Sequence, residues 1–578
     1  MTKLRSPKRA LIALVVVCAV AIGIMHYAVL GSHQAVAVTA RRHLAVTANP
    51  LASEAAREIL RKGGSAVDAA IAAQLVLTLV EPQSSGIGGG LFMLVADKKG
   101  QARVFDGREV APGAARPDMF LSPRGKPRSF EEISTGGLAV GVPGAVAAMW
   151  DSHIRYGKLP WRDLFAPAIK LAEQGFPITP LLSQAIEQLE PHYLPEATRT
   201  IYFYPDGKPK TTGHVIRDPA FAKTLRLLAD KGRAGFYEGP VAEAIVTAVR
   251  SSSTNPGIMR LADLANYRSI EREALCRPYR SYRVCTTPPP SGGLTLLQML
   301  ALLEKVPPSQ LEPRTPSQAH LITQASRLAY ADRAKWLADP ELVPVPDDGL
   351  MDDNYLASRS KTINEKRDAG RVDAGTPPVK ASALPKFAPH RTPVGHGTSH
   401  LAIVDDDGLV VSMTMSVQAA FGSQVRAAGF ILNNELTDFS TEPKVEGRLV
   451  ANAPAANKRP LSAMSPSIVF DPKGQLFAAI GSPGGPDIIG YNARALVDLI
   501  DGKSSVSDAV SNPHIVNLNG PTYLEKRLAA VPIAVGLMTR GHSVRFRSLE
   551  SGLNGIVKVD SGYEGASDVR GEGAAVGD

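Results

Sequence analysis

The residues with the clearest chemical potential lie in the run VGHGTSH at positions 394–400, where a Pro-rich segment ends and a strand-like pattern begins. A threonine that becomes the first residue of a chain can act as a nucleophile, with its own α-amine as the base. Thr398 reaches that state if its hydroxyl attacks the carbonyl of Gly397 and the peptide bond breaks, and glycine tolerates the strained backbone that this needs. A threonine that simply opens a strand after a loop has the same local pattern, so the spacing alone leaves both interpretations open.

Signatures of other common catalytic centres are absent from the sequence. It contains no G-x-S-x-G elbow, no H-E-x-x-H helix, no dinucleotide-binding fingerprint and no phosphate-binding P-loop. The glycine-rich run GIGGG at 86–90 lacks P-loop spacing and precedes a strand-like segment, which favours close backbone packing. We therefore expect neither a cofactor nor a metal ion.

The segments on either side of the junction must position Thr398. Residues 374–397 carry five prolines and no apolar period, which predicts a linker or a surface excursion. Residues 400–417 alternate between apolar and polar and contain the turn sequence DDG, which predicts a β-hairpin. Further strands are predicted at 91–96, 103–106, 429–434, 465–481 and 555–560.

Helices dominate the first part of the chain. Pro50 can open a helix that ends at Gly63-Gly64, and Ser65 with Asp68 forms a capping box for the next one. That second helix, at 66–80, is apolar nearly all round and should be buried. Buried helices beside antiparallel hairpins predict an α+β fold, with sheets packed face to face and helices outside.

The N-terminus accounts for much of the positive charge. Four Lys and Arg residues precede an apolar run at 10–25, and the small-residue stretch AVA at 35–37 is typical of a signal-peptidase site. Residues 1–37 hold no Asp or Glu, so their removal lowers the net charge of the 578-residue chain from +9 to +5. We expect a signal peptide, a periplasmic or secreted protein and no nucleic-acid partner. The alternative is an uncleaved membrane anchor through residues 10–30.

Two cysteines lie beyond this leader, Cys276 and Cys285, in the sequence ALCRPYRSYRVCTT. A hairpin that turns at Arg280-Ser281 places them directly opposite each other, at a separation that a disulfide can bridge. Two buried free thiols are the other interpretation. Neither cysteine has a CxxC partner, so a zinc site is not expected.

Many ordered segments resemble the γ-glutamyltranspeptidase (glutathione hydrolase) family, across nearly all of residues 45–578. The matching segments are NPLASEAAREILRKGGSAVDAAIA, EPQSSGIGGGLFMLV, FDGREVAP, GLAVGVPGAVAA, PPPSGG, YADRAKWLADPELVPVP, GTSHLAIVDDDG, GFILNNELTDFS, NKRPLSAMSPSIV, GSPGG and DVRGEGAAVG. The chain is therefore identified as a member of this family.

The resemblance implies a four-layer αββα sandwich of the N-terminal-nucleophile hydrolase type. It implies a precursor that cleaves itself before Thr398 into a large subunit, 38–397, and a small subunit, 398–578, which work as a heterodimer. Thr398 would attack the γ-glutamyl amide of glutathione or of a similar compound. Water or an amino acid or dipeptide acceptor would then resolve the acyl-enzyme.

The resemblance also assigns the acyl-binding residues. Arg108 and Ser462 would hold the α-carboxylate of the substrate, because a guanidinium fork matches two carboxylate oxygens. Glu435 and Asp438 would accept from the α-ammonium group. Without the resemblance, Arg108 would be interpreted as a surface partner of Glu109, and the two acids as solvated turn residues.

Three further residues belong to the reaction centre that the resemblance implies. Gly484 and Gly485 would offer backbone N–H groups to the oxyanion, and Ser416 would support the nucleophile in place of the threonine that is usual in the family. A tight turn after a strand is the plainer interpretation of the glycine pair.

Other positions depart from the pattern of the family and bear on the substrate. Gln418 replaces an Asn of the better-known members, and Ala463 replaces the second Ser of a Ser-Ser pair. The loop 440–457 is shorter than a full lid and contains no Tyr. The leading hypothesis is a γ-glutamyl hydrolase and transferase. The alternatives are an acylase for glutaryl-type β-lactam side chains, which these departures motivate, and a non-catalytic binding homologue.

Overall fold

The computed structural model describes residues 34–192, 194–379, 386–390, 395 and 397–578. The predicted leader lies outside the described residues up to position 33. Ala35 is already buried against the body of the protein, and β1 begins at Val38. Within the described ranges, no helix has both the length and the apolarity needed to cross a bilayer.

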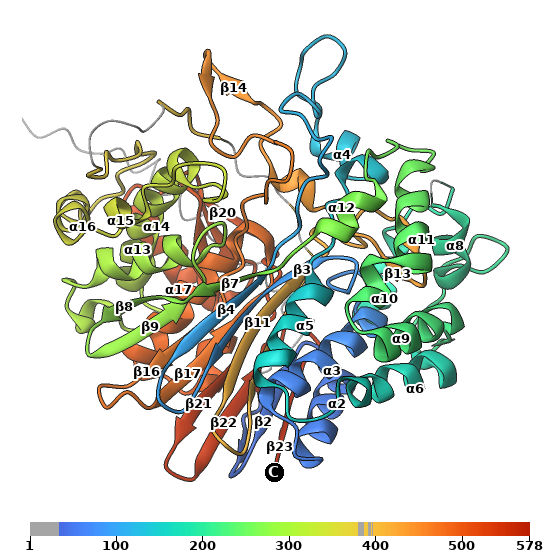
Figure 1. The fold of residues 1–578 in the computed structure, drawn as a ribbon. Helices are drawn as coiled ribbons and strands as arrows, with labels where there is room; N and C mark the ends of the chain where they lie inside the picture. The colour runs from blue at the N-terminus through green and yellow to red at the C-terminus, as the bar shows by residue number, and fades with distance from the viewer. Residues whose placement is uncertain (1–33, 193, 380–385, 391–394, 396) are drawn as a thin grey trace, which may run out of the picture.

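Two seven-stranded sheets form the centre of the molecule, and all neighbouring strands in them are antiparallel (Figure 1). Sheet I contains, in spatial order, β1 (Val38–Ala40), β22 (Gly562–Ser567), β21 (Asn554–Val559), β17 (Leu476–Gly481), β16 (Ser467–Phe470), β9 (Tyr282–Thr286) and β8 (Leu275–Tyr279). Sheet II contains β23 (Ala574–Gly577), β2 (Leu44–Thr47), β10 (Thr398–Val404), β11 (Val410–Ser416), β3 (Gly90–Ala96), β4 (Ala102–Gly107) and β7 (Ile270–Glu273).

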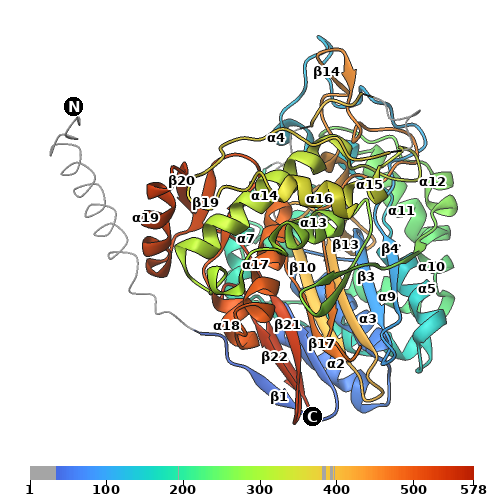
Figure 2. The same cartoon turned by 90° about the vertical axis from the view of Figure 1, so that its left-hand side faces the viewer.

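Helices cover the outer face of each sheet. On sheet II lie α2 (Pro50–Arg61), α3 (Ala66–Val80) and α5 (Ala145–Tyr156); on sheet I lie α13 (Gly293–Leu303), α14 (Pro316–Trp336) and α17 (Ile488–Ile500). Figure 1 shows the two groups on opposite sides of the strands, and Figure 2 shows α13 and α14 from the front. The prediction of a four-layer αββα sandwich is confirmed.

Side-chain alternation along β10 explains the layers. Leu401 and Ile403 pack among the helices on sheet II, whereas Ala402 and Val404 pack against Ile468 and other residues of sheet I. Successive side chains of a strand point to opposite faces, so a strand that is apolar on both faces is buried between two layers. All seven residues of β10 are buried.

The remaining elements surround this sandwich. The other helices are α4 (Phe130–Ile133), α6 (Ala166–Gln174), α7 (Pro180–Glu187), α8 (Glu196–Tyr202), α9 (Pro219–Lys231), α10 (Ala234–Tyr237), α11 (Gly239–Arg250), α12 (Leu261–Asn266), α15 (Asp347–Leu350), α16 (Asp353–Ser360), α18 (Val506–Ser511) and α19 (Val531–Thr539). Short strands are β5 (Phe176–Pro177), β6 (Val215–Ile216), β12 (Arg426–Ala427), β13 (Phe430–Ile431), β14 (Lys444–Val445), β15 (Arg448–Leu449), β18 (Ile515–Asn517), β19 (Thr522–Glu525) and β20 (Val544–Arg547). The 3₁₀ helices near the site are η4 (Glu435–Asp438) and η5 (Gly485–Asp487).

Several local predictions are confirmed. Helix α2 begins at Pro50, and Ser65 and Asp68 form the reciprocal capping box of α3, with N–O distances of 3.1 and 2.9 Å. The predicted hairpin is β10–β11. In the β8–β9 hairpin Cys276 stands opposite Cys285, and the structure joins them in a disulfide.

Two predictions need correction. The segment 374–397 is not a surface excursion at Phe387, Ala388 and His390, which are buried. Phe387 belongs to a hydrophobic cluster with Trp336 and neighbouring residues, and the Ala388 N–H donates to the Leu449 carbonyl at 2.8 Å. The strand predicted at 429–434 ends after Ile431, and beyond it Asn433 donates its side-chain amide to loop carbonyls.

Candidate active site

Thr398 is the first residue of β10, and the register pairs it with Ser416, the last residue of β11. The Thr398 hydroxyl donates to Ser416 Oγ at 3.3 Å, and the Ser416 hydroxyl donates to the Gly397 carbonyl oxygen at 2.7 Å. Ser416 Oγ also accepts from the Gln418 backbone N–H at 2.8 Å. One buried hydroxyl therefore links the predicted nucleophile to the carbonyl of the predicted cleavage site.

Gly484 and Gly485 follow β17 and lead through η5 into α17. Their φ angles are 130° and 55°, in the region that favours glycine. A Cβ atom on Gly484 would lie 2.5 Å from Cε2 of Tyr491 and 2.8 Å from the Glu550 carbonyl oxygen. Larger residues do not fit at Gly484, and the turn lies just before η5 and α17, where backbone N–H groups favour negative charge.

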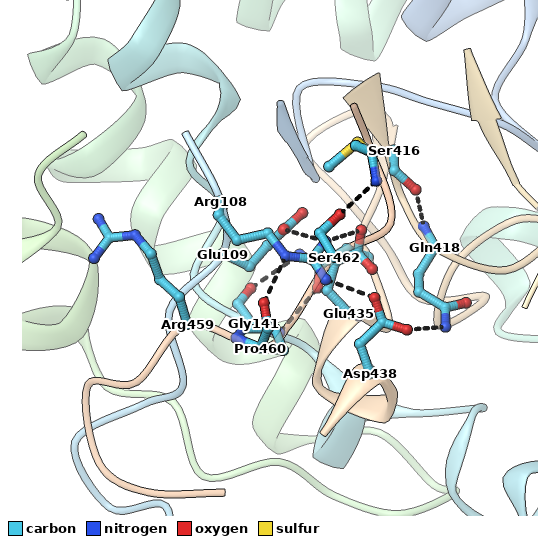
Figure 3. A network of polar contacts seen from close by, with 12 residues as sticks. Arg108, Glu109, Gly141, Ser416, Gln418, Glu435, Asp438, Arg459, Pro460 and Ser462 are labelled. Carbon is cyan, nitrogen blue, oxygen red and sulfur yellow. Dashed lines mark hydrogen bonds and ion pairs between the residues drawn. The ribbon is translucent and has the colours of Figure 1, made fainter. Parts of the chain in front are cut away.

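Arg108 lies at the end of β4 and is 1% exposed. Its Nη1 is 2.7 Å from Oε1 of Glu435 and its Nη2 is 2.5 Å from Oδ2 of Asp438 (Figure 3). Glu109 Oε2 lies 3.4 Å from Nη1. The structure thus brings together the three charged residues that the sequence motifs assign to the acyl group.

Backbone carbonyls complete the coordination of Arg108. Its Nε donates to Pro460 O at 3.1 Å (Figure 3). Its Nη2 donates to Leu461 O at 3.0 Å. Each nitrogen of this guanidinium therefore has an acceptor supplied by the protein.

Burial and like charge set the protonation of this cluster. Desolvation raises the pKa of Glu435 and, more strongly, that of Glu109, while Arg108 opposes both shifts. Desolvation disfavours the charge of Arg108, but Glu435 and Asp438 hold its pKa above the ordinary value. One cation therefore faces the buried carboxyl groups of Glu109 and Glu435 and the partly exposed one of Asp438, and the like charges of the acids add to desolvation in raising the pKa of Glu109.

The remaining predicted substrate residues line the same space. Gln418 has a positive φ of 82°, and its Nε2 donates to Asp438 Oδ1 at 2.9 Å (Figure 3). Ser462 Oγ accepts from the Met464 N–H at 3.2 Å. Ala463 stands beside them without a polar side chain.

Two cavities meet at Thr398. The smaller one has a volume of about 40 Å³ and is lined by Arg108, Arg333, His390, Gly395, Thr398, Ser416, Gln418, Glu435, Asp438, Leu461, Ser462, Ala463, Met464, Gly485, Pro486 and Ile488. The larger has a volume of about 470 Å³, and its lining includes Glu81, Gly397, Thr398, Gly484, Glu525, Lys526, Arg527, Glu550 and Arg570. Across the described part of the chain, no group of three or more His, Cys, Asp or Glu side chains could hold a metal ion.

Comparison with known proteins identifies the family. A family model described as Gamma-glutamyltranspeptidase matches residues 52–578. The chain belongs to the γ-glutamyltranspeptidase family. This confirms the resemblance found in the motifs, and it makes the chain an enzyme of the N-terminal-nucleophile hydrolase fold.

Among the proteins similar to this γ-glutamyltranspeptidase, some are named glutathione hydrolases and others acylases. The chain is 36% identical over 545 residues to the glutathione hydrolase proenzyme of Bacillus subtilis (strain 168), which covers 92% of this chain and 91% of that protein. It is 34% identical over 547 residues to the Acylase ACY 1 proenzyme of Pseudomonas sp. (strain SE83), covering 93% of each. A cephalosporin acylase crystal structure from Bacillus halodurans superimposes with a TM-score of 0.81 at 28% identity, covering 94% of this chain and 97% of that one.

Sequence reasoning missed several residues of this γ-glutamyltranspeptidase site. Arg333, in the motif YADR, lines the small cavity, and burial lowers its pKa to about 10. His390 lines it too, from the segment interpreted as a linker. Glu81 lines the large cavity and accepts from the Ser399 hydroxyl at 2.8 Å, and burial raises its pKa to about 8. A family motif gave a signal for Arg333 and Glu81, but none showed that they reach the site.

The loop 440–457 does not act as a lid in this structure. It forms the β14–β15 hairpin, which projects from the body (Figure 1), and none of its residues lines either cavity. Gly395 of the segment before the cleavage site lines the small cavity instead.

Proposed function

We propose that the protein is a self-processing γ-glutamyltransferase and glutathione hydrolase. It cleaves γ-glutamyl amide bonds through an acyl-enzyme on Thr398 and transfers the acyl group to water or to amino acid or dipeptide acceptors. The contact of Ser416 with both the Thr398 hydroxyl and the Gly397 carbonyl is the observation that carries the proposal. The resemblance to glutathione hydrolase proenzymes supports the substrate class.

Self-cleavage comes first. The Thr398 oxygen attacks the Gly397 carbonyl carbon, and the Ser416 hydroxyl stabilises the developing oxyanion because it donates to that oxygen. The hydroxyl proton of Thr398 goes to its own nitrogen as the C–N bond breaks, which leaves an ester. Water then hydrolyses the ester and frees the Thr398 amine and the Gly397 carboxylate. The products are a large subunit, 38–397, and a small subunit, 398–578.

The freed amine then serves as the general base for the Thr398 hydroxyl. The γ-carbonyl of the donor lies at Thr398, and the N–H groups of Gly484 and Gly485 stabilise its oxyanion. Such donors contribute roughly 3 kcal/mol each. The amine leaves, and water or an acceptor amine attacks the ester to return the free enzyme. No cofactor enters these steps.

The charge pattern of the small cavity suits a zwitterion. The α-carboxylate of the substrate replaces one of the carboxyl partners of Arg108 and accepts a second hydrogen bond from Ser462. The α-ammonium group of the substrate takes the place of the guanidinium group beside Glu435 and Asp438. Each buried charge keeps a partner, which is the condition for tolerating buried ions. Gln418 orients Asp438 through its amide.

The uncut chain obstructs this cavity. A Cβ atom on Gly395 would lie 2.1 Å from Gln418 Oε1, so Gly395 itself packs directly on this proposed substrate-binding residue. Cleavage turns the segment before Thr398 into a free chain end that can withdraw. The precursor is therefore inactive, and the two subunits together form the enzyme.

The second candidate is an acylase for glutaryl-type donors. Ala463 removes one hydroxyl from the carboxylate site, Gln418 changes the amide position, and relatives named acylases cover nearly the whole chain. A glutaryl group lacks the α-ammonium group, so Glu435 and Asp438 would have one cationic partner fewer than with a glutamyl group. This charge balance favours the γ-glutamyl donor.

Kinetics with paired donors test the proposal. Initial rates with γ-glutamyl and glutaryl p-nitroanilides should give a higher kcat/KM for the γ-glutamyl donor, and Thr398→Ala should turn over neither. A preference for glutaryl would establish the acylase instead. Absence of turnover with both, in a self-cleaved protein, would refute the proposed function.

Export of the protein through residues 1–37 belongs to the same proposal, with a periplasmic or secreted enzyme as the product. The Lys and Arg residues of that segment and the AVA stretch support it. Attachment to a membrane would occur only through an uncleaved leader.

A further inference from the structure

Arg333 stands out among the residues of the small cavity. It lies in the last turn of α14, is 4% exposed and donates through Nη2 to the Ser462 carbonyl oxygen at 2.7 Å. Among the residues that the structure describes, none accepts a hydrogen bond from its Nη1. A buried donor left without an acceptor is destabilising because its desolvation is not offset, and the effect is larger for a charged group. The cavity therefore lacks one acceptor next to Ser462.

Arg333 also lacks a counter-ion. None of the described Asp and Glu residues forms an ion pair with it, and the residues outside the described ranges include no Asp or Glu. Desolvation lowers the pKa of Arg333 to about 10, so the side chain remains a cation at neutral pH. The nearby carboxylates of Glu435 and Asp438 pair with Arg108 instead.

The two arginines of the cavity therefore differ. All three nitrogens of Arg108 have protein acceptors, among them two carboxylates. Arg333, by contrast, has an N–H group without an acceptor among the described residues and forms no ion pair with them, although the charge of Asp438 acts on it from a distance; it lines a cavity of about 40 Å³. That volume holds roughly three water-sized groups, which is enough for a carboxylate.

We infer that Arg333 binds the α-carboxylate of the donor, through the hydrogen bond that Ala463 cannot make. The inference rests on the proposed function and deepens it, because it names the group that recognises the carboxylate end of the acyl chain. Arg333 and Ala463 line the same cavity, and Arg333 already contacts the backbone of Ser462.

The charge balance agrees with this assignment. Arg108 and Arg333 are the two cations of the cavity, and Glu435 and Asp438 are the acidic groups beside Arg108. Burial raises the pKa of Glu435 to about 7 and that of the neighbouring Glu109 well above its ordinary value. A zwitterionic acyl group adds no net charge. Its carboxylate contacts Arg108 and Ser462 as in the proposed function and gains Arg333 as a further cation, and its ammonium group lies beside Glu435 and Asp438.

The test compares three donors that carry 7-amino-4-methylcoumarin as the leaving group: γ-glutamyl, glutaryl and 4-aminobutyryl amides. The last lacks only the α-carboxylate. In self-cleaved Arg333→Gln, we expect kcat/KM to fall about 10- to 100-fold for γ-glutamyl and glutaryl, mainly through KM. The value for 4-aminobutyryl should change less than about threefold. Lys335→Gln, on the same helix, is the matched control and should leave all three unchanged.

A second variant tests the role of position 463. Adding Ala463→Ser to Arg333→Gln restores a hydroxyl group that can donate a hydrogen bond to the carboxylate. We expect kcat/KM to rise about tenfold above that of Arg333→Gln for the γ-glutamyl and glutaryl amides only. A purely structural role for Arg333 would not give rescue that depends on the donor.

The outcomes are distinct. An equal fall for all three donors in Arg333→Gln, or no fall for any, overturns the inference while the wild-type turnover of γ-glutamyl still supports the proposed function. If Arg333→Gln does not self-cleave, Arg333→Lys replaces it, because it keeps the cation. In Arg333→Lys, a smaller fall in kcat/KM that is confined to the γ-glutamyl and glutaryl donors supports the inference, and an equal fall for all three donors overturns it. A self-cleaved wild type that hydrolyses none of the donors overturns the proposed function itself.

Discussion

The two cavities at Thr398 differ in how far their charged side chains are exposed. In the small one, the ion pairs of Arg108 with Glu435 and Asp438 are largely removed from solvent. In the large one, Lys526 and Glu550 are exposed and Arg527 is partly exposed, although the pair of Glu525 with Arg570 is buried there. Exposed ion pairs contribute little because water screens them, whereas a buried charge that loses its partner is costly.

We propose that this difference divides the two parts of a substrate between the cavities. In this proposal the small cavity selects the acyl group, since a wrong acyl group leaves a buried charge unpaired, and the large cavity, about 470 Å³ in volume, receives varied leaving groups and acceptors. Thr398 lines both cavities, with Gly485 in the small one and Gly484 in the large one.

Removal of the nucleophile gives the largest effect, because both cavities depend on Thr398. Thr398→Ala should remain a single chain, and its turnover of γ-glutamyl p-nitroanilide should fall at least about 10⁴-fold. Thr398→Ser, which keeps a hydroxyl, is the control and should still cleave itself. Gel electrophoresis and initial rates measure both. Cleavage of Thr398→Ala at the same bond would place the nucleophile elsewhere.

Loss of the Ser416 hydroxyl should give the second-largest effect, on the rate of self-cleavage. Ser416→Ala removes the donor to the Gly397 carbonyl, so we expect self-cleavage to slow about 10²- to 10³-fold. Ser416→Thr keeps a hydroxyl and should cleave at nearly the normal rate. Quantifying precursor and products over time gives the rates, and equal rates in Ser416→Ala and wild type would remove Ser416 from the mechanism.

A matched pair of substitutions tests the contrast between the cavities directly. Asp438→Asn breaks a buried contact with Arg108 and should lower kcat/KM for γ-glutamyl p-nitroanilide about 10- to 100-fold. Lys526→Gln, in the large cavity, should lower it less than about threefold. Comparable losses in the two variants would mean that burial does not separate the functions of the cavities.

Glu81 is a buried acid in the lining of the large cavity, and it gives the smallest predicted effect. Burial raises its pKa from 4.5 to about 8, so between those values the native state binds a proton that the unfolded state has lost. The free energy of unfolding therefore falls as the pH rises through this range, by about 1.4 kcal/mol per unit at most.

Glu81→Gln mimics the protonated acid and can still accept from Ser399. We expect its thermal midpoint to fall less than that of the wild type between pH 5 and pH 8, as measured by calorimetry at one scan rate. Parallel pH profiles for the two proteins would show that Glu81 is ionised in the native state.

Local patterns predicted the elements well. The alternation of residues 400–417 and the turn DDG were sufficient for the β10–β11 hairpin, and its register follows from the turn, which places Thr398 opposite Ser416. The capping box of α3 and the opposed cysteines of β8–β9 followed from equally local signals.

Contacts between distant segments could not be predicted in this way. Arg108 and Asp438 are 330 positions apart, and only family motifs indicated that they meet. Arg333 lies in a 21-residue helix whose pattern distinguishes buried from exposed faces but not which cavity a buried side chain reaches. The burial of Phe387 was missed because the surrounding prolines indicated a linker, although the segment packs against Trp336 and its neighbours.

The central claim is that Thr398 is both the site of self-cleavage and the residue that carries the acyl group. Mass spectrometry of the purified protein, quenched in acid during turnover of a γ-glutamyl anilide, tests both parts together. The account predicts a small chain with the mass of residues 398–578, a fraction of which carries one γ-glutamyl group on its N-terminal threonine. An uncut chain, or a label on any other residue, would contradict it.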